Sequence, residues 1–523
     1  MVNIQDKGSL YFENPILPGF YPDPSICRAG EDYYLVTSSF AYYPGVPIFH
    51  SRDLVHWEQI GHVLDRPSQL DLDGVEHSQG IYAPTIRYHD GRFYMITTNV
   101  TKGGNFIVTS EKPEGPWSDP YWLADAPGID PSLFFDDDGR CYVTGTWEVP
   151  EGPAYYGDNE IWMRELDLDT MTLKGERFGL WRGALKNAIW PEAPHIYKKD
   201  GYYYLMIAEG GTDFHHSVTI ARSRDITVPY VGCPSNPILT HRHLGRNYPI
   251  VNAGHGDLVE TQNGEWWMVL LASRPYGGYY RNLGRETFLV PVIWEDGWPV
   301  ASPGTGKVEF SYPYPDLPRW EIEPPAAVDH FDKSSLDPCW MFLRTPREEF
   351  CSLTERPGYL RLKVRPKRLT ELANPSLVCR RQQHMSFTAR TVLEFVPDPG
   401  EAAGMVLLQS DRYHYRMEYA LEDDQTMVRL VRCMDGIETI INAVSWRSDR
   451  FEMMIMSRDQ DYSFYFGDGE EKIPLAQNVD GRILSTDVAG GFVGTTIGLY
   501  ASGNGRESLN TADFDLFEYR VVL

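Results

Sequence analysis

Residues 130–143 read DPSLFFDDDGRCYV, in which an acid beside a proline opens an apolar segment, a glycine marks a turn and an aromatic segment follows. The order of apolar segment, turn and aromatic segment recurs in four more parts of the chain, which begin at Asp23, Ala83, Glu192 and Gly256. Each copy pairs two strand-like segments across a turn, and the copies begin about 45 to 65 residues apart, close to the spacing of propeller blades. Five copies predict a five-bladed β-propeller.

The composition agrees with a chain built almost entirely from strands. Of its 523 residues, 42% are hydrophobic and 13% aromatic, which is enough apolar material for two packed cores. Helix breakers are frequent, with 46 glycines and 38 prolines, and long helical periodicity is nearly absent. Seven cysteines without a Cys-x-x-Cys pair predict reduced thiols rather than a zinc site or a disulfide framework. We therefore expect an all-β protein.

The repeats stop at a proline-rich connector over residues 311–326. We expect a propeller domain over residues 1–324 and a second domain over residues 325–523. The second part contains short alternating segments, for example residues 359–364 and 391–396, separated by turns. This pattern predicts a two-sheet β-sandwich.

Charge and hydropathy exclude several classes of partner. The formal net charge of −25 argues against a nucleic-acid partner, because phosphate binding usually requires a basic surface. No stretch reaches the roughly 18 apolar residues of a membrane span, and residues 1–10 lack the features of a signal peptide. These observations predict no membrane partner and a cytoplasmic location, and they are compatible with a homo-oligomer.

Three of the repeated segments begin with an acid beside a proline, namely Asp23, Asp130 and Glu192. If the first strand of each blade is innermost, these carboxyl groups face one channel. Inverting glycoside hydrolysis needs one acid to protonate the departing oxygen and one carboxylate to activate water, roughly 6.5 to 9.5 Å apart. A third acid helps by raising the pKa of the proton donor. A single Asp-Pro usually only begins a turn, but recurrence at matching positions favours a catalytic interpretation.

Several segments occur in the same order as landmarks of glycoside hydrolase family 43, namely residues 14–25, 80–86, 128–134, 191–195 and 254–261. The chain resembles this family over nearly its whole length. The resemblance implies a five-bladed propeller followed by a concanavalin-like jelly-roll sandwich, as in the two-domain β-xylosidases and α-L-arabinofuranosidases.

The resemblance also implies a role for each acid. Asp23 is expected to be the general base that activates water, and Glu192 the general acid. Asp130 is expected to orient Glu192 and to tune its pKa. Together these roles imply inversion at the anomeric carbon.

Further residues match family positions that contact the sugar. Arg285, Thr212 and His255 are expected to line the pocket, and His255 could contact a calcium ion through water. No cofactor is otherwise required. Phe40 and Tyr82 are expected to pack against the sugar ring, and Tyr42 is a further aromatic candidate.

Two features bear on the substrate. Many β-xylosidases of the family have Trp-Ala-Pro-Asp where this chain has Tyr82-Ala-Pro-Thr85. The resemblance therefore implies a different pocket wall, formed in part by Thr85, and shifts the expectation towards arabinofuranosidase. In the second domain, Phe492 within Gly490-Gly-Phe-Val-Gly is expected to close the pocket.

The leading hypothesis is an exo-acting, inverting glycoside hydrolase that acts as an α-L-arabinofuranosidase, a β-D-xylosidase, or both. Its substrates would be arabinoxylan or xylo-oligosaccharides, from which it would release terminal pentoses. The alternatives are a non-catalytic carbohydrate-binding propeller and an endo-arabinanase. A third alternative concerns the sandwich, which could be an independent carbohydrate-binding module.

Overall fold

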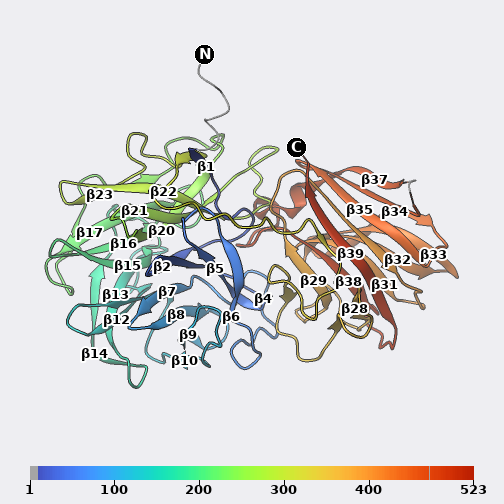
Figure 1. Cartoon of the computed structure of the whole chain (residues 1–523), viewed down its shortest axis with the longest axis horizontal. Coiled ribbons are helices and arrows are strands. Elements are labelled where there is room, and N and C mark those ends of the chain that lie inside the picture. The colour runs from blue at the N-terminus through green and yellow to red at the C-terminus, as the bar shows by residue number, and fades with distance from the viewer. Residues whose placement is uncertain (1–9, 470–471, 523) are drawn as a thin grey trace, which may run out of the picture.

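The computed structural model describes residues 10–469 and 472–522, which form two all-β bodies lying side by side (Figure 1). Five antiparallel sheets make up the first body. The strands of the first sheet are β2 (Ser25–Ala29), β3 (Asp32–Val36), β5 (Gly45–Ser51) and β6 (Glu58–Leu64). Those of the second sheet are β7 (Thr85–His89), β8 (Arg92–Asn99), β9 (Gly104–Ser110) and β10 (Tyr121–Trp122).

The remaining three sheets follow in chain order. The third consists of β11 (Ile129–Phe135), β12 (Cys141–Glu148), β13 (Asn159–Asp167) and β14 (Thr172–Trp181). The fourth consists of β15 (Glu192–Lys199), β16 (Tyr202–Glu209) and β17 (Ser217–Ser223), with β18 (Val231–Gly232) and β19 (Leu239–Thr240) both paired to β17. The fifth consists of β20 (Val251–Glu260), β21 (Trp266–Ser273), β22 (Glu286–Glu295) and β23 (Trp298–Ala301).

The first strands of the five sheets form a closed ring. Strand β2 contacts β7 on one side and β20 on the other, and β11 and β15 complete the circuit between them. The first strand of every sheet is therefore innermost, which confirms the five-bladed propeller predicted from the repeats. Two of the repeated turns show why they contain Asp-Gly: φ is positive at Asp90 and Gly91 (48° and 78°) and at Asp200 and Gly201 (50° and 75°). A tight hairpin turn of this type requires positive φ at both central positions.

The start of the described chain is fastened to the last blade. Strand β1 (Tyr11–Glu13) pairs with β24 (Ser311–Pro313), which follows the fifth sheet. The Asn14 side chain donates to the Leu289 carbonyl at 2.9 Å and accepts from the Leu289 amide at 2.9 Å. These contacts join the two ends of the propeller segment, because β22 is a strand of the fifth blade.

The second body is a sandwich of two antiparallel sheets that enclose one apolar core. One sheet contains β27 (Cys351–Ser352), β28 (Leu360–Lys363), β39 (Thr511–Val521), β30 (Phe387–Glu394), β35 (Arg450–Arg458), β36 (Asp461–Gly467) and β37 (Ile473–Asp480), with β25 (Val328–Asp329) paired to β39. The other contains β29 (Ser376–Arg381), β38 (Thr496–Ser502), β31 (Ala402–Ser410), β32 (Tyr413–Glu422), β33 (Gln425–Met434) and β34 (Ile437–Ser445). A 3₁₀ turn, η2 (Gly481–Leu484), and helix α1 (Thr486–Ala489) lie between β37 and β38. The predicted sandwich is confirmed.

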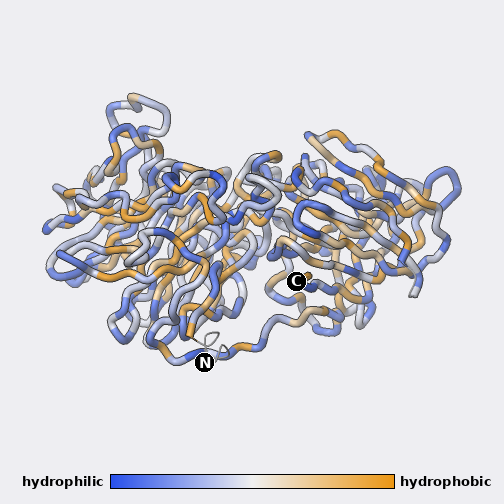
Figure 2. The backbone as a smooth tube through the Cα atoms, turned by 90° about the horizontal axis from the view of Figure 1, so that it is seen from above, coloured by the Kyte–Doolittle hydropathy of each residue, from blue (hydrophilic) through white to orange (hydrophobic). Residues whose placement is uncertain are grey.

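The two bodies share a junction rather than a loose linker. Strand β4 (Tyr42–Tyr43) of the propeller pairs with β26 (Phe342–Leu343) of the second body, and one apolar cluster contains residues from both. Arg344 is fully buried there. Its Nε donates to the Val75 carbonyl at 2.6 Å, and its Nη2 donates to both carboxylate oxygens of Asp411 at 3.0 and 2.9 Å. Apolar segments run through both bodies (Figure 2).

The connector over residues 314–327 contains neither helix nor strand and includes the boundary that the sequence places at 324–325. Within the described ranges, no helix combines the length and apolar character that a membrane crossing would need. All seven cysteines are free thiols, and five of them are buried. Residues 1–9, which contribute to the expected cytoplasmic location, lie outside the described residues.

Candidate active site

The three predicted acids sit where the innermost strands begin. Asp23 lies two residues before β2, Asp130 is the second residue of β11, and Glu192 is the first residue of β15. The pairing register shifts beside Asp130 and beside Glu192, and φ is positive at Asp130 (53°) and at Ala193 (52°). Each shift contains a proline, Pro131 or Pro194, and proline offers no amide proton to the neighbouring strand. These bulges re-aim the side chains away from the regular ladder.

Asp23 is held as a carboxylate. Its Oδ1 accepts from Arg285 Nη1 at 2.7 Å, and its Oδ2 accepts from the Ser38 hydroxyl at 2.6 Å. His255 Nδ1 lies 3.6 Å from Oδ1. Burial works to raise the pKa of Asp23, but Arg285, His255 and Ser38 outweigh it and hold the pKa below its usual value. Asp23 is therefore ionised at neutral pH and can accept a proton.

The pKa values of Glu192 and Asp130 are raised, whereas that of Asp23 is lowered. Desolvation raises the pKa of Glu192 well above its usual value, and the charges of Asp130 and Asp23 raise it further. Burial and then the charge of Asp23 raise the pKa of Asp130 to about 7. Neither acid forms an ion pair within the described part of the chain. The pair can hold a proton at neutral pH, as a general acid must.

Arg285 connects Asp23 to the wall of the pocket. Its Nη1 also donates to the Thr212 hydroxyl at 2.9 Å. The Nε of Arg285 is buried and has no hydrogen-bond partner among the described residues. An unpaired buried donor is costly unless a ligand satisfies it, so Arg285 is suited to bind a sugar hydroxyl.

Three aromatic rings from three parts of the chain surround Arg285. The ring of Phe40 lies 6.3 Å from that of Phe492, and the Tyr82 ring meets Phe40 and Phe492 edge-on at 5.8 and 5.9 Å. The Arg285 guanidinium lies 5.8 Å from the Phe40 ring and 5.6 Å from the Phe492 ring. The Phe492 amide is fixed by the Ser78 hydroxyl at 2.9 Å. The predicted sugar-binding residues thus lie together, and their roles stay predictions.

Two interpretations from the sequence need correction. Tyr42 does not line the pocket: it is fully buried at the domain junction, where its hydroxyl lies 3.0 Å from His77 Nε2 and 3.3 Å from Thr496 Oγ1. Thr85 is also buried and donates to the Pro131 carbonyl at 3.0 Å. Thr85 therefore braces the second blade against the residue after Asp130 instead of forming the pocket wall.

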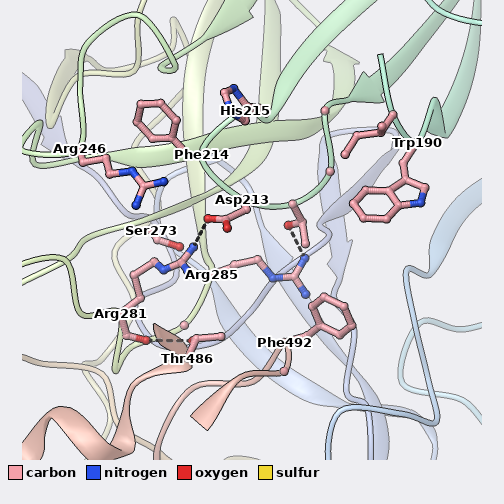
Figure 3. Close-up of a pocket in the computed structure, with 16 residues that line it drawn as sticks. Trp190, Asp213, Phe214, His215, Arg246, Ser273, Arg281, Arg285, Thr486 and Phe492 are labelled. Atoms are coloured by element: carbon pink, nitrogen blue, oxygen red, sulfur yellow. Dashed lines mark hydrogen bonds and ion pairs between the residues drawn. The ribbon is translucent and has the colours of Figure 1, made fainter. Parts of the chain in front are cut away.

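A cavity of about 430 Å³ opens outward from Arg285 (Figure 3). Its lining comes mainly from residues 189–190, 210–215, 281–285 and 486–492, so both domains contribute to it. The acids themselves are not part of this lining. The cavity therefore lies beyond the acids, on the solvent side of Arg285 and Thr212.

The sequence reasoning missed several lining residues, including Trp190, Asp213, Phe214, Arg246 and Arg281. They lie in loops between blade strands, outside the repeated segments. Trp190 alone had a usable signal, because it is two residues from Glu192.

The residues near His255 do not offer a ready set of calcium ligands. Within residues 10–469 and 472–522, no group of three His, Cys, Asp or Glu side chains could hold a metal. The oxygens of Asp23 are already engaged by Arg285 and Ser38. Calcium prefers six to eight oxygen ligands, so direct ligation by the protein does not fit this site, and a water-mediated ion stays a prediction.

A second buried aspartate lies close to the same axis. Asp257 on β20 accepts from Arg87 at 2.9 Å, Tyr197 at 2.6 Å, Ser25 at 2.7 Å and the Ile26 amide at 3.1 Å. Burial works against its charge, but Arg87 and the other donors hold the pKa of Asp257 well below its usual value. These contacts link the first, second, fourth and fifth blades.

Comparison with known proteins agrees with this architecture. The family described as "Glycosyl hydrolases family 43" matches residues 12–299, and "Beta xylosidase C-terminal Concanavalin A-like domain" matches residues 328–520. A xylosidase/arabinosidase of Butyrivibrio fibrisolvens is 50% identical over 97% of this chain and 99% of its own. A non-reducing end α-L-arabinofuranosidase of Bacteroides ovatus is 39% identical over 98% of this chain and 95% of its own. The structure of a xylan β-1,4-xylosidase from Bacillus halodurans has a TM-score of 0.92 at 38% identity, over 97% of this chain and all of its own.

Proposed function

The chain belongs to glycosyl hydrolase family 43, and we propose that it removes single pentose units from the non-reducing ends of oligosaccharides with inversion of configuration. It is a glycoside hydrolase whose full-length relatives release terminal pentoses. This sets aside a non-catalytic propeller.

The proposed reaction uses the three acids in different protonation states. Asp23, as a carboxylate, takes a proton from a water molecule whose oxygen forms a bond to the anomeric carbon. Glu192 gives its proton to the glycosidic oxygen as the bond from that oxygen to the anomeric carbon breaks. Attack from the face opposite the leaving group inverts the anomeric centre. Asp130 keeps Glu192 protonated until the transfer.

One observation carries this proposal: the protein lowers the pKa of Asp23 and raises that of Glu192, although the two acids are close enough for the charge of Asp23 to act on Glu192. Opposite shifts in neighbouring acids are the arrangement that a base and an acid need. A purely structural role for these acids would favour pairing both with cations.

The shape of the pocket supports exo action. Phe492 comes from the sandwich and lies against Phe40, so the second domain covers one side of the sugar pocket. An endo-acting arabinanase needs an open groove, and this contact blocks one. We propose arabinoxylan-derived oligosaccharides as substrates, because the relatives include arabinofuranosidases and xylosidases. A cytoplasmic location, which suits imported oligosaccharides, and a homo-oligomer stay predictions.

The test is a paired assay with 4-nitrophenyl α-L-arabinofuranoside and 4-nitrophenyl β-D-xyloside, followed by NMR of the first anomer released from an oligosaccharide. We expect turnover of at least one substrate and an inverted anomer. Absence of turnover with both would reject the substrate assignment, and a retained anomer would reject the mechanism. A Glu192→Ala variant that matched the wild type on an oligosaccharide would reject the acid assignment.

A further inference from the structure

The cavity of about 430 Å³ beyond Arg285, called the outer cavity below, is the space we assign to the leaving group. This assignment rests on the proposed function, in which Glu192 protonates the oxygen of the leaving group, so that group lies beside Glu192. Trp190, two residues earlier, forms the adjacent cavity wall. Its ring is closely packed, since a Cβ on Gly211 would lie 2.5 Å from it, and it meets the exposed Tyr156 ring edge-on at 5.2 Å. A fixed indole of this kind is a suitable platform for a sugar ring.

Three arginines line the cavity, and two of them are neutralised by carboxylates. Arg285 pairs with Asp23 at 2.7 Å. Arg281 pairs with Asp213 at 3.0 Å and with Asp487 at 2.7 Å. These pairs hold the cavity walls in place, and their charges are largely cancelled within the protein.

Arg246 differs from both. Among the described residues no carboxylate pairs with Arg246, and its guanidinium makes no hydrogen bond to another side chain or carbonyl. It lies 5.2 Å from the Phe214 ring and 5.3 Å from the Tyr279 ring, which hold it by cation–π attraction. Arg246 extends into the pocket from the wall opposite Trp190 (Figure 3). Its N–H groups are free to donate to a ligand.

We propose that Arg246 makes the outer cavity a subsite for a leaving group that carries a carboxylate, such as a pentose oligosaccharide with a uronic acid substituent or an aldonic acid end. Arginine donates two parallel hydrogen bonds to a carboxylate, and a charged acceptor strengthens them. The chain has a net charge of −25 and would repel an acidic sugar at long range. An unneutralised cation inside the cavity offsets that repulsion where the ligand binds.

The test compares two substrates that differ at one terminal group, a carboxylate in one and a neutral alcohol in the other. Xylobionate, in which the reducing end of xylobiose is oxidised to a carboxylate, is matched by xylobiitol, in which it is reduced to an alcohol. We expect Arg246→Gln to lower the xylobionate-to-xylobiitol ratio of kcat/KM about two- to fivefold, the range for an exposed charged contact. Arg246→Lys should lie between the two, and added salt should lower the wild-type ratio.

A matched control variant is Arg224→Gln. Arg224 is also exposed and lies 4.2 Å from an aromatic ring, that of Tyr202, but it is outside the cavity. This variant should leave the ratio at its wild-type value. An equal loss on both substrates in Arg246→Gln would assign Arg246 to sugar hydroxyls, and kcat/KM values unchanged on both substrates would remove it from the subsite. Either result overturns the proposal.

A second arm distinguishes the two sources of the carboxylate and separates this inference from the proposed function. Xylonate and glucuronate, with xylitol and glucose as neutral partners, are tested as inhibitors of 4-nitrophenyl pentoside hydrolysis. We expect each acid to inhibit the wild-type enzyme more strongly than its neutral partner does. The acid that inhibits more strongly shows whether the carboxylate comes from an aldonic acid end or from a uronic acid substituent. Hydrolysis without selective inhibition by either acid would refute this inference alone, whereas no hydrolysis would refute the proposed function.

Discussion

Two buried aspartates lie against arginines near the axis of the propeller, and they are used differently. Asp257 has a partner for each of its oxygens, and Arg87 donates to both. Asp23 also has an arginine, but the Nε of Arg285 finds no partner in the described part of the chain. Both oxygens of Asp257 are therefore satisfied within the protein, whereas the arginine beside Asp23 keeps a donor that a ligand can satisfy.

The neighbours of the two aspartates extend the contrast. Around Asp257 the nearby ionisable side chains bring hydrogen bonds and positive charge. Around Asp23 the other carboxyl groups, Asp130 and Glu192, bring like charge at a buried site. Unpaired buried acids destabilise a fold, so their presence on one side of the axis marks that side as the reacting centre.

The largest effect should follow from changing the reacting acids. Glu192→Gln should lower kcat on an oligosaccharide by roughly 10²- to 10⁴-fold, the usual contribution of a general acid. The loss should be smaller with a 4-nitrophenyl pentoside, because nitrophenolate leaves without full protonation. The thermal unfolding temperature should not fall, because the substitution removes an acid that has no cationic partner among the described residues. Kinetics on both substrates and calorimetry measure these effects, and equal losses on the two substrates would argue against proton donation.

Asp257→Asn should lower stability and leave kcat largely unchanged, the reverse of Glu192→Gln. It leaves Arg87 buried beside a neutral amide, which should lower the free energy of unfolding by about 3 kcal/mol. The folded fraction should keep most of its kcat at low temperature. Denaturant titration and kinetics on the same sample measure both effects. A variant with wild-type stability and lost turnover would place Asp257 in the reacting centre and remove the contrast between the two clusters.

Phe492→Ala tests whether the reacting centre depends on the second domain, as the Asp257 cluster does not. Removal of the ring that faces Phe40 and Arg285 should raise KM and lower kcat/KM about tenfold, with little change in stability. Tyr156→Ala, at the outer edge of the cavity, is the matched aromatic control and should have a smaller effect. Kinetic constants identical to wild type would exclude Phe492 from the pocket.

The smallest expected effect is a shift of the pH profile. The negative charge of Asp130 raises the pKa of Glu192, so Asp130→Asn should lower that pKa. A general acid works only when protonated, and the alkaline limb of kcat/KM should therefore move to lower pH. The acidic limb, set by protonation of Asp23, should stay in place. A pH series on wild type and variant measures both limbs, and an alkaline limb that moved upward would contradict the role of Asp130.

The sequence predicted what is repeated and missed what occurs once. The five blades and the three acids follow from segments that recur in order, so each copy supports the others. Tyr42 was misplaced because an aromatic residue beside Phe40 looks the same whether it faces a pocket or a domain junction. Arg246 could not be found, because its significance depends on its having no carboxylate partner in space among the residues that the structure describes.

The sandwich illustrates the same limit. Alternating strands predicted it, but they could not show that β26 pairs with β4 or that one apolar cluster spans both domains. These contacts argue against an independent binding module, because removal of the second domain would expose the shared cluster. Deletion of the residues after about 325 should therefore impair folding or activity, not only polymer binding.

The pairing of β4 with β26 also sets an order of events during synthesis. Translation delivers the acids and Arg285 first, and β4 then waits with an unpaired edge until β26 emerges from the ribosome. Phe492 follows later still. Since domains generally fold as units from the N-terminus, a nascent propeller can assemble its acids before it has a closed pocket. The newly made enzyme should therefore gain its fold in two stages and its capacity to retain a sugar only in the second.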